Sequence, residues 1–315
     1  MERAGIEHVR GFNRTVAERI GALTDGFLGR KRPMGESRVL WEIGAGGAEV
    51  RELRGRLGLD SGYLSRVLRS LERARLITVG TGAGDGRVRY ARLTADGRAE
   101  RAELDGRADA VAWTFLAPLS QKHRGQLIAA MADVERLLRA SMIEIAVEDP
   151  ATPDARWCID QYIAELNTRF ESGFDPSRSI SADADELTPP AGALFIARLR
   201  GRPVGCGALK FHDGAPAELK RMWVAPEVRG FGLGRRILVA LEQHARERGV
   251  RVLHLETNGT LTEAIALYRA SGYREVRAYN NEPYAHHWLE KALTSPGETA
   301  TVTSGRPASS PSKDT

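Results

Sequence analysis

The stretch Val224-Ala225-Pro226-Glu227-Val228-Arg229-Gly230-Phe231-Gly232-Leu233-Gly234-Arg235-Arg236 decides the fold of the chain around it. Polar and apolar residues alternate before it, from Glu218 to Val224, and predict a strand. Apolar residues recur at helical spacing after it, up to Gly249, and predict a helix. A glycine-rich turn at that junction lets a ligand approach the backbone, and the helix N-terminus favours an anion. The stretch therefore predicts a diphosphate site, although a merely tight loop would also explain the glycines.

The residues that follow carry a family resemblance. A second alternating strand is expected over Val250–Glu256, and a helix over Glu263–Ser271 ends at Gly272. With Arg229–Gly234, Asn258, Tyr268 and Tyr273, these elements resemble the acetyl-CoA-binding core of the GNAT N-acetyltransferases, from about Trp157 to Leu293. The resemblance implies an α/β fold with a mixed, mostly antiparallel sheet.

The same resemblance implies a reaction and a set of site residues. Acetyl-CoA would serve as co-substrate and pass its acetyl group directly to an amine, so the two cysteines, Cys158 and Cys206, need no role. Tyr268 matches the tyrosine that protonates the departing thiolate, and Glu218 is the best candidate for a general base or for an anchor of a cationic substrate. The residues expected to bind the cofactor are Val224, Arg229, Gly230, Gly232, Gly234, Arg235 and Asn258.

Several of these roles have plain structural alternatives. Tyr268 also suits a core position on its helix, and Asn258 suits a loop cap. Glu218 could instead form a surface ion pair with Lys220 or Arg221, in which case Glu256 is the second candidate base. Strand alternation places Glu218, Lys220, Met222 and Val224 on one face and Leu219, Arg221 and Trp223 on the other.

The N-terminal part predicts a helix-turn-helix. Short helices are expected over residues 36–45, 49–57 and 62–73, and the last two are joined through Gly58. Residues 50–92 contain ten arginines against four acidic residues. On the helix 62–73, Arg66, Arg69 and Arg73 lie opposite an apolar stripe, as a recognition helix requires for the major groove of DNA.

A hairpin is expected next, with strands over 76–79 and 87–94 and with Arg87 and Arg89 near its tip. Tyr63-Leu64-Ser65-Arg66, Asp85-Gly86-Arg87 and Leu93-Thr94-Ala95-Asp96-Gly97 resemble the MarR family of winged-helix regulators over about residues 5–145. The resemblance implies a homodimer that binds double-stranded, pseudo-palindromic DNA, with Ser65 among the contacts. The dimer would pair through a helix over 6–28 and a long helical stretch from Asp96 to Glu148, interrupted at Pro118.

Composition and the positions of the prolines indicate the domain boundaries. We expect a mainly α winged-helix and dimerisation domain over 1–148, a linker over 149–156, an acetyltransferase domain over 157–293 and a disordered tail over 294–315. The charged N-terminus lacks a signal core and no run reaches membrane-spanning length, so a cytoplasmic protein without membrane contact is expected. Adjacent His286 and His287 on a strand point oppositely, and no metal site is predicted.

The sequence thus predicts a bifunctional MarR-like regulator and acetyl-CoA-dependent N-acetyltransferase acting on a small-molecule or amino-acid amine. One alternative is a regulator whose C-terminal domain only senses acetyl-CoA or a metabolite. Another is an enzyme whose winged helix serves only dimerisation, which the arginine row disfavours.

Overall fold

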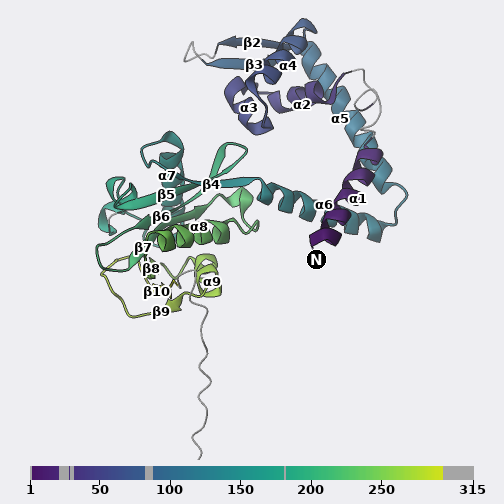
Figure 1. Ribbon diagram of the computed structural model, residues 1–315. Helices are drawn as coiled ribbons and strands as arrows, with labels where there is room; N and C mark the ends of the chain where they lie inside the picture. Colours follow the sequence, from purple (N-terminus) through teal and green to yellow (C-terminus); the bar gives the residue numbers. More distant parts are fainter. Residues whose placement is uncertain (1, 21–27, 29–31, 82–87, 181, 294–315) are drawn as a thin grey trace, which may run out of the picture. The chain divides into compact units, whose positions relative to one another are not determined.

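The computed structural model describes residues 2–20, 28, 32–81, 88–180 and 182–293 (Figure 1). The chain divides into two compact units, the first consisting mainly of Met1–Ile143 and the second beginning at Glu144. The predictions for Arg87 and for the tail 294–315 lie outside the described residues.

The first unit consists of helices around a small sheet. Its elements are α1 (Glu2–Arg19), α2 (Met34–Ile43), β1 (Ala48–Glu49), α3 (Val50–Leu57), α4 (Ser61–Arg73), β2 (Ile77–Thr81), β3 (Arg89–Leu93), α5 (Ala95–Leu116) and α6 (Gln121–Ser141). The strands form one sheet in the order β1-β3-β2. This order, with α3 and α4 preceding the β2–β3 hairpin, confirms the winged helix-turn-helix.

Local sequence explains where α3 ends and α4 begins. Gly58 adopts a left-handed conformation with φ of 63° and ends α3. The Asp60 side chain accepts a hydrogen bond of 2.8 Å from the backbone N–H of Tyr63 and caps α4. The Leu64, Leu68 and Leu71 side chains are almost fully buried and pack this helix onto the core of the unit.

The second unit is built on a seven-stranded sheet. Its strands are β4 (Ile143–Glu148), β5 (Gly192–Leu199), β6 (Arg202–Lys210), β7 (Ala217–Val224), β8 (Val252–Thr257), β9 (Arg274–Glu275) and β10 (His287–Ala292). They are ordered β4-β5-β6-β7-β8-β10-β9. β7 pairs with β6 in an antiparallel and with β8 in a parallel manner. The predicted mixed, mostly antiparallel α/β sheet is confirmed.

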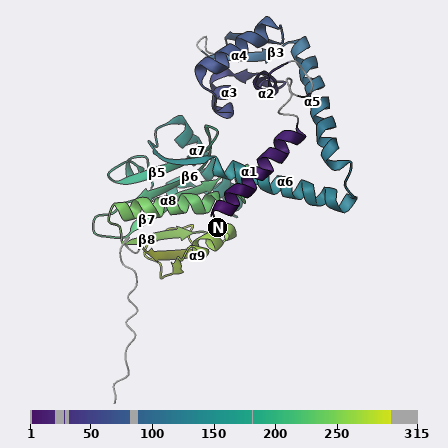
Figure 2. The same cartoon turned by 45° about the vertical axis from the view of Figure 1, so that its right-hand side comes forward.

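Three α-helices belong to the described part of this unit. They are α7 (Pro153–Arg169), α8 (Leu233–Glu247) and α9 (Thr262–Ala270). Figures 1 and 2 show α8 lying along the sheet, and its Ile237, Leu238 and Leu241 side chains are fully buried. α7 contacts β7 through Trp157, whose ring lies 5.7 Å from that of Trp223 in an edge-on arrangement.

The prediction of a helix continuing to Glu148 is wrong. α6 ends at Ser141, and Ile143–Glu148 forms β4, at one edge of the large sheet. The β-branched residues Ile143, Ile145 and Val147 recur at every second position, a spacing that favours a strand. The predicted helix over 6–28 likewise begins at Glu2 and ends at Arg19. α7 begins before Trp157, because Thr152 caps it and Pro153 occupies its first turn.

The predicted alternation along residues 218–224 is also wrong. The pairing of β6 with β7 shifts register between Cys206 and Ala208, so Arg221 and Met222 together oppose one residue of β6. Arg221 adopts a φ of 56° at this bulge. Beyond the bulge the two faces of β7 exchange. Trp223 points toward α7, where its indole N–H donates to Glu165. Met222 and Val224 point toward α8, because they lie beside Gly207, which faces α8, and Gly234 of α8.

Candidate functional site

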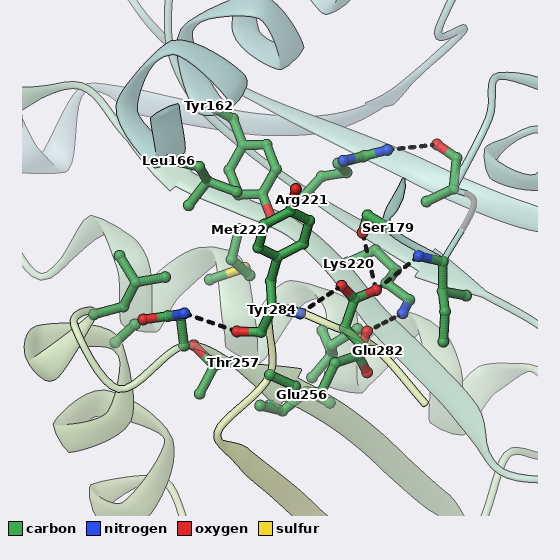
Figure 3. A pocket seen from close by; sticks show the side chains of 18 of the residues that line it. Tyr162, Leu166, Ser179, Lys220, Arg221, Met222, Glu256, Thr257, Glu282 and Tyr284 are labelled. Carbon is green, nitrogen blue, oxygen red and sulfur yellow. Dashed lines mark hydrogen bonds and ion pairs between the residues drawn. The ribbon is translucent and has the colours of Figure 1, made fainter. Parts of the chain in front are cut away.

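A cleft opens where β7 and β8 diverge. The two strands pair only at Ala217 with Leu253 and at Glu218 with His254. Past these residues the cleft is lined by Lys220, Arg221 and Met222 of β7, Glu256 of β8 and Tyr162 of α7 (Figure 3). Phe170, just past the end of α7, and Tyr268 of α9 also line it. Two loops complete it, one through Ser179 and Ile180 and the other through Glu282 and Tyr284.

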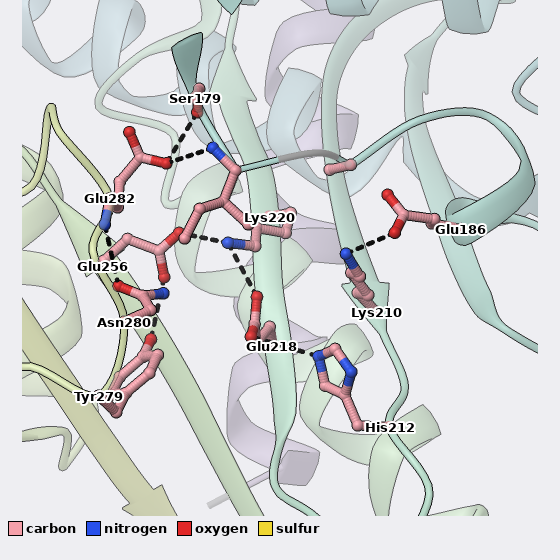
Figure 4. Close-up of polar contacts among 12 residues, drawn as sticks. Ser179, Glu186, Lys210, His212, Glu218, Lys220, Glu256, Tyr279, Asn280 and Glu282 are labelled. Carbon is pink, nitrogen blue, oxygen red and sulfur yellow. Dashed lines mark hydrogen bonds and ion pairs between the residues drawn. The ribbon is translucent and has the colours of Figure 1, made fainter. Parts of the chain in front are cut away.

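Lys220 bridges two carboxylates at the side of the cleft. Its Nζ lies 2.9 Å from Glu218 Oε2 and also pairs with Glu256 Oε1 (Figure 4). Glu218 further contacts His212 Nε2 at 3.2 Å, and Glu256 accepts a 2.9 Å hydrogen bond from the Tyr279 hydroxyl. The ion pair expected for Glu218 therefore exists, but it is buried: the Lys220 side chain is only 8% exposed.

The charges in this cluster stabilise one another. Burial alone would raise the pKa of Glu218, but the hydrogen bond and charge of Lys220 outweigh it and hold the pKa below its usual range. Burial would lower the pKa of Lys220, but Glu256 and Glu218 raise it. Both groups are therefore ionised at neutral pH.

Tyr268 lies in the cleft, whereas Glu218 is set behind Lys220. The Tyr268 side chain is 6% exposed, and burial, with smaller contributions from Tyr162 and Glu256, raises its pKa well above the usual value. The hydroxyl thus stays protonated at any physiological pH. Of the two predicted carboxylates, Glu256 lines the cleft and Glu218 does not.

Asn258 holds two loops together. Its Nδ2 donates to the Tyr284 carbonyl at 2.7 Å, and its Oδ1 accepts from the backbone and hydroxyl of Thr260 at 3.0 and 2.9 Å. The side chain therefore acts as the loop cap considered above, and direct contact with a cofactor stays a prediction.

The glycine-rich turn leads into the N-terminus of α8 as expected. Gly230 and Gly232 adopt φ angles of 79° and 71°, and no atom lies within 4 Å of a Cβ added to either. The first backbone hydrogen bond of the helix runs from Arg236 N to Gly232 O, so the N–H groups of the first turn have no intrahelical partner. The turn is thus an open set of donors at the positive end of a helix dipole.

The other predicted cofactor residues differ in their surroundings. Arg229 donates to the Val224 carbonyl at 3.0 Å and pairs with Glu165 of α7, so it ties the turn to that helix. Gly234 is tightly packed, because an added Cβ would lie 3.2 Å from the Leu267 side chain. Arg235 is exposed on the first turn of α8.

Glu282 fastens the two loops that border the cleft. Its Oε2 accepts hydrogen bonds from the Ser179 hydroxyl at 2.9 Å and from the Ile180 backbone at 2.7 Å, and its Oε1 accepts from the Tyr284 backbone at 3.2 Å. The sequence analysis did not select Glu282. Nothing in its local pattern marks it, because its partners are about 100 residues away in the chain.

The cysteines and adjacent histidines have structural surroundings. Cys158 and Cys206 are buried free thiols. His286 accepts from the Gly259 backbone, whereas His287 contacts Glu275, so the two imidazoles point apart. Within the described ranges, no group of three or more potential ligands could hold a metal ion, and no helix is long and apolar enough to span a membrane.

A basic surface lies on the first unit. Arg66, Arg69 and Arg73 are exposed on α4, opposite its buried leucines, and Ser65 is partly exposed between them. Among the described residues, no carboxylate forms an ion pair with any of the three arginines. Arg89 is exposed at the end of β3, paired in register with Thr81 of β2. Arg92, which the sequence analysis did not select, is also exposed and lies 5.0 Å over the Tyr90 ring.

The comparisons with known proteins match both units. The acetyltransferase (GNAT) family model matches residues 159–273, and the MarR family model matches residues 28–88. The chain is 36% identical over 134 residues to the IAA acetyltransferase of Azospirillum brasilense, covering 42% of this chain and 85% of that protein. It is 30% identical over 125 residues to the uncharacterized N-acetyltransferase YjgM of Escherichia coli, covering 38% of this chain and 73% of that protein.

A solved structure gives a further likeness. The crystal structure of a GNAT-family acetyltransferase from Staphylococcus aureus aligns with 48% of this chain and 99% of its own, with a TM-score of 0.42 and 16% identity. The sequence matches are the stronger finding, because relatives at 30% identity or more are covered over most of their length. The chain belongs to the GNAT family of acetyltransferases, and residues 28–88 of its winged helix match the MarR family model.

Proposed function

We propose that the protein is an acetyl-CoA-dependent N-acetyltransferase acting on an amine and, through its winged helix, a DNA-binding transcriptional regulator. The observation that carries the enzyme proposal is the position of Tyr268, a buried and protonated phenol, in the cleft at the diverging strands. A domain that only sensed acetyl-CoA would need no proton donor there.

The turn at the start of α8 fits the diphosphate of acetyl-CoA. An anion can approach the backbone at Gly230 and Gly232, where no side chain intervenes, and can accept hydrogen bonds from the first turn of the helix. Arg235 would add a positive charge. Arg229, which is already paired with Glu165, would instead hold the turn in place.

The chemistry requires two proton movements. When bound, acetyl-CoA supplies the electrophilic thioester, and the free amine of the acceptor attacks it. Tyr268 holds a proton that can pass to the departing thiolate. Of the two carboxylates that pair with Lys220, Glu256 lines the cleft, so we assign it to accept the amine proton, directly or through water. Glu218 then keeps Lys220 in position.

Replacing Gly232 by aspartate should abolish acetyl-CoA binding. A side chain would fill the open approach to the turn, and its carboxylate would repel the diphosphate. Isothermal calorimetry with the full chain measures the loss. Gly249→Asp is the matched control, because Gly249 has a similar φ of 76° and open surroundings but lies past the end of α8. Undiminished binding by Gly232→Asp would remove the turn from the cofactor site.

The basic surface of the first unit supports DNA binding by a dimer. Exposed arginines on one face of α4 suit a major groove, and Arg89 at the hairpin suits phosphates or a minor groove. Apolar side chains are exposed on the helices outside the winged helix: Ile6, Val9 and Phe12 on α1, Trp113 on α5, and Ile128, Met131, Leu137 and Leu138 on α6. We infer that a second copy covers them, which pairs two arginine faces for a pseudo-palindromic site.

Arg66→Ala should relax the preference among DNA sequences by about 1–3 kcal/mol, if Arg66 reads a base edge. Arg89→Ala should instead weaken binding to all sequences and flatten the dependence on salt, as loss of a phosphate contact does. Selection from random duplexes at moderate salt, followed by titrations at several salt concentrations, measures both. Arg38→Ala, which removes an arginine already paired with Glu42, is the control. Recovery of no enriched site would contradict the proposal.

A further inference from the structure

Arg221 is a cation in the cleft that no carboxylate of the described residues balances. It lines the cleft beside Lys220, but Lys220 is neutralised by two carboxylates. Within the described part of the chain, no carboxylate forms an ion pair with Arg221. Its Nη2 reaches only the Ala182 carbonyl, at 3.4 Å, and its Nε is buried with no hydrogen-bond partner. A buried donor without a partner is costly, which points to a partner that arrives with the substrate.

The fold holds this arginine in place at some expense. Its backbone φ of 56° lies in the left-handed region, which residues with a side chain rarely adopt. Its guanidinium lies 5.6 Å from the centre of the Tyr162 ring, on the α7 side of the cleft (Figure 3). Strained conformations of this kind persist where the surrounding structure enforces them, and they cluster at functional sites. Both observations favour a binding role over a surface charge.

The chemistry of the lining selects the kind of anion. A guanidinium presents parallel N–H donors that match the two oxygens of a carboxylate. The same cleft contains the carboxylates of Glu256 and Glu282, which would repel a doubly charged phosphate. An acceptor that carries one negative charge together with its amine satisfies both conditions.

Part of the remaining lining is apolar and aromatic. The rings of Phe170, Phe174 and Tyr284 form one cluster, with Phe174 and Tyr284 4.9 Å apart. Leu166 lies beside them in the lining. These walls suit an apolar side chain on the acceptor.

We propose that the acetyl acceptor is a carboxylate-bearing amine, such as a free α-amino acid with an apolar side chain, and that Arg221 binds its carboxylate. This proposal rests on the proposed N-acetyltransferase function and names the acceptor class for the same cleft. Arg221 is then a specificity-determining residue: it distinguishes an acid from the corresponding amide.

The test compares amino acids with their carboxamides as acceptors. The wild-type protein, Arg221→Met and Arg221→Lys are assayed for release of free CoA with leucine, phenylalanine and the other apolar amino acids, and with the matching amides. Arg221→Met should lose about 10–100-fold more kcat/KM on the acids than on the amides, because only the acids lose a charge-assisted bond. Taking the ratio of mutant to wild type for each acceptor cancels the difference in amine pKa between acids and amides.

Arg221→Lys should recover part of the loss on the acids, since it keeps the positive charge but not the parallel N–H donors of the guanidinium. Arg251→Met is the matched control, because it removes an exposed arginine of the same unit that does not line the cleft. Thermal unfolding checks that each variant is folded. Equal losses on acids and amides would overturn the assignment of Arg221. The same holds if the wild-type protein acetylates only amines that lack a carboxylate. Acetylation of no amine at all by the wild type would instead overturn the proposed enzyme function.

Discussion

Replacing Tyr268 by phenylalanine is expected to lower turnover by about 10²–10⁴-fold, the usual contribution of a general acid. The change removes one hydroxyl from a buried ring and leaves the turn at the start of α8 untouched. Affinity for acetyl-CoA should therefore stay nearly constant. Steady-state kinetics with a working acceptor and calorimetry with acetyl-CoA separate the two effects.

Tyr273→Phe provides the control for Tyr268→Phe. Tyr273 is also buried, and its ring lies 5.8 Å from that of Tyr268, but it does not line the cleft. Its replacement should change turnover little. If Tyr268→Phe keeps full turnover, the thiolate takes its proton from water or another group. If the wild type acetylates no amine but changes its DNA affinity when acetyl-CoA is added, the second unit is a sensor.

Replacing Lys220 by methionine is expected to destabilise the protein by about 3–5 kcal/mol, the cost of leaving buried charges without their partner. Glu218 and Glu256 are only 15% and 8% exposed, so water cannot take over the role of the ammonium group. Denaturant-induced unfolding, followed at the transition of the second unit, measures the difference in the free energy of unfolding. Adding Glu218→Gln and Glu256→Gln to the same variant should recover much of the loss, since no buried charge then lacks a partner.

Arg269→Met is the matched control for Lys220→Met. It breaks an ion pair with Glu275 whose side chains are 55% and 47% exposed, and exposed pairs contribute about 0–1 kcal/mol. If Lys220→Met costs no more than Arg269→Met, the buried cluster does not stabilise the fold.

The same cluster gives a sign for the pH dependence. The pKa of Glu218 is lowered in the folded protein, so its stabilisation is present above the pKa of the unfolded chain and is lost as pH falls through the folded value. The gap in stability between the wild type and Lys220→Met should therefore shrink in acid, below the usual glutamate range.

The order of most elements and the candidate binding surfaces could be proposed from local sequence. Asp60, Gly58 and the leucines of α4 define the helix-turn-helix through capping and helical spacing, which depend on neighbours a few residues apart. Gly230 and Gly232 likewise indicate a turn, because the positive φ angles that favour glycine there are a property of their own backbone. Tyr268 could be selected because it lies on a short motif, and the structure places it in the cleft.

The charges and faces inside the cleft depended on residues distant in the chain. The bulge at Arg221 exchanged the faces of β7, because it arises from register with β6, which no pattern within β7 encodes. Lys220 meets Glu256 across two strands 36 residues apart, and Glu282 meets Ser179 across 103 residues. The sequence by itself determined the two domain types and the turn at the start of α8, since these follow from local periodicity and glycine. Only the tertiary structure decided that Glu256 faces the cleft and that no carboxylate of the described residues pairs with Arg221, because burial and charge pairing are properties of packed neighbours.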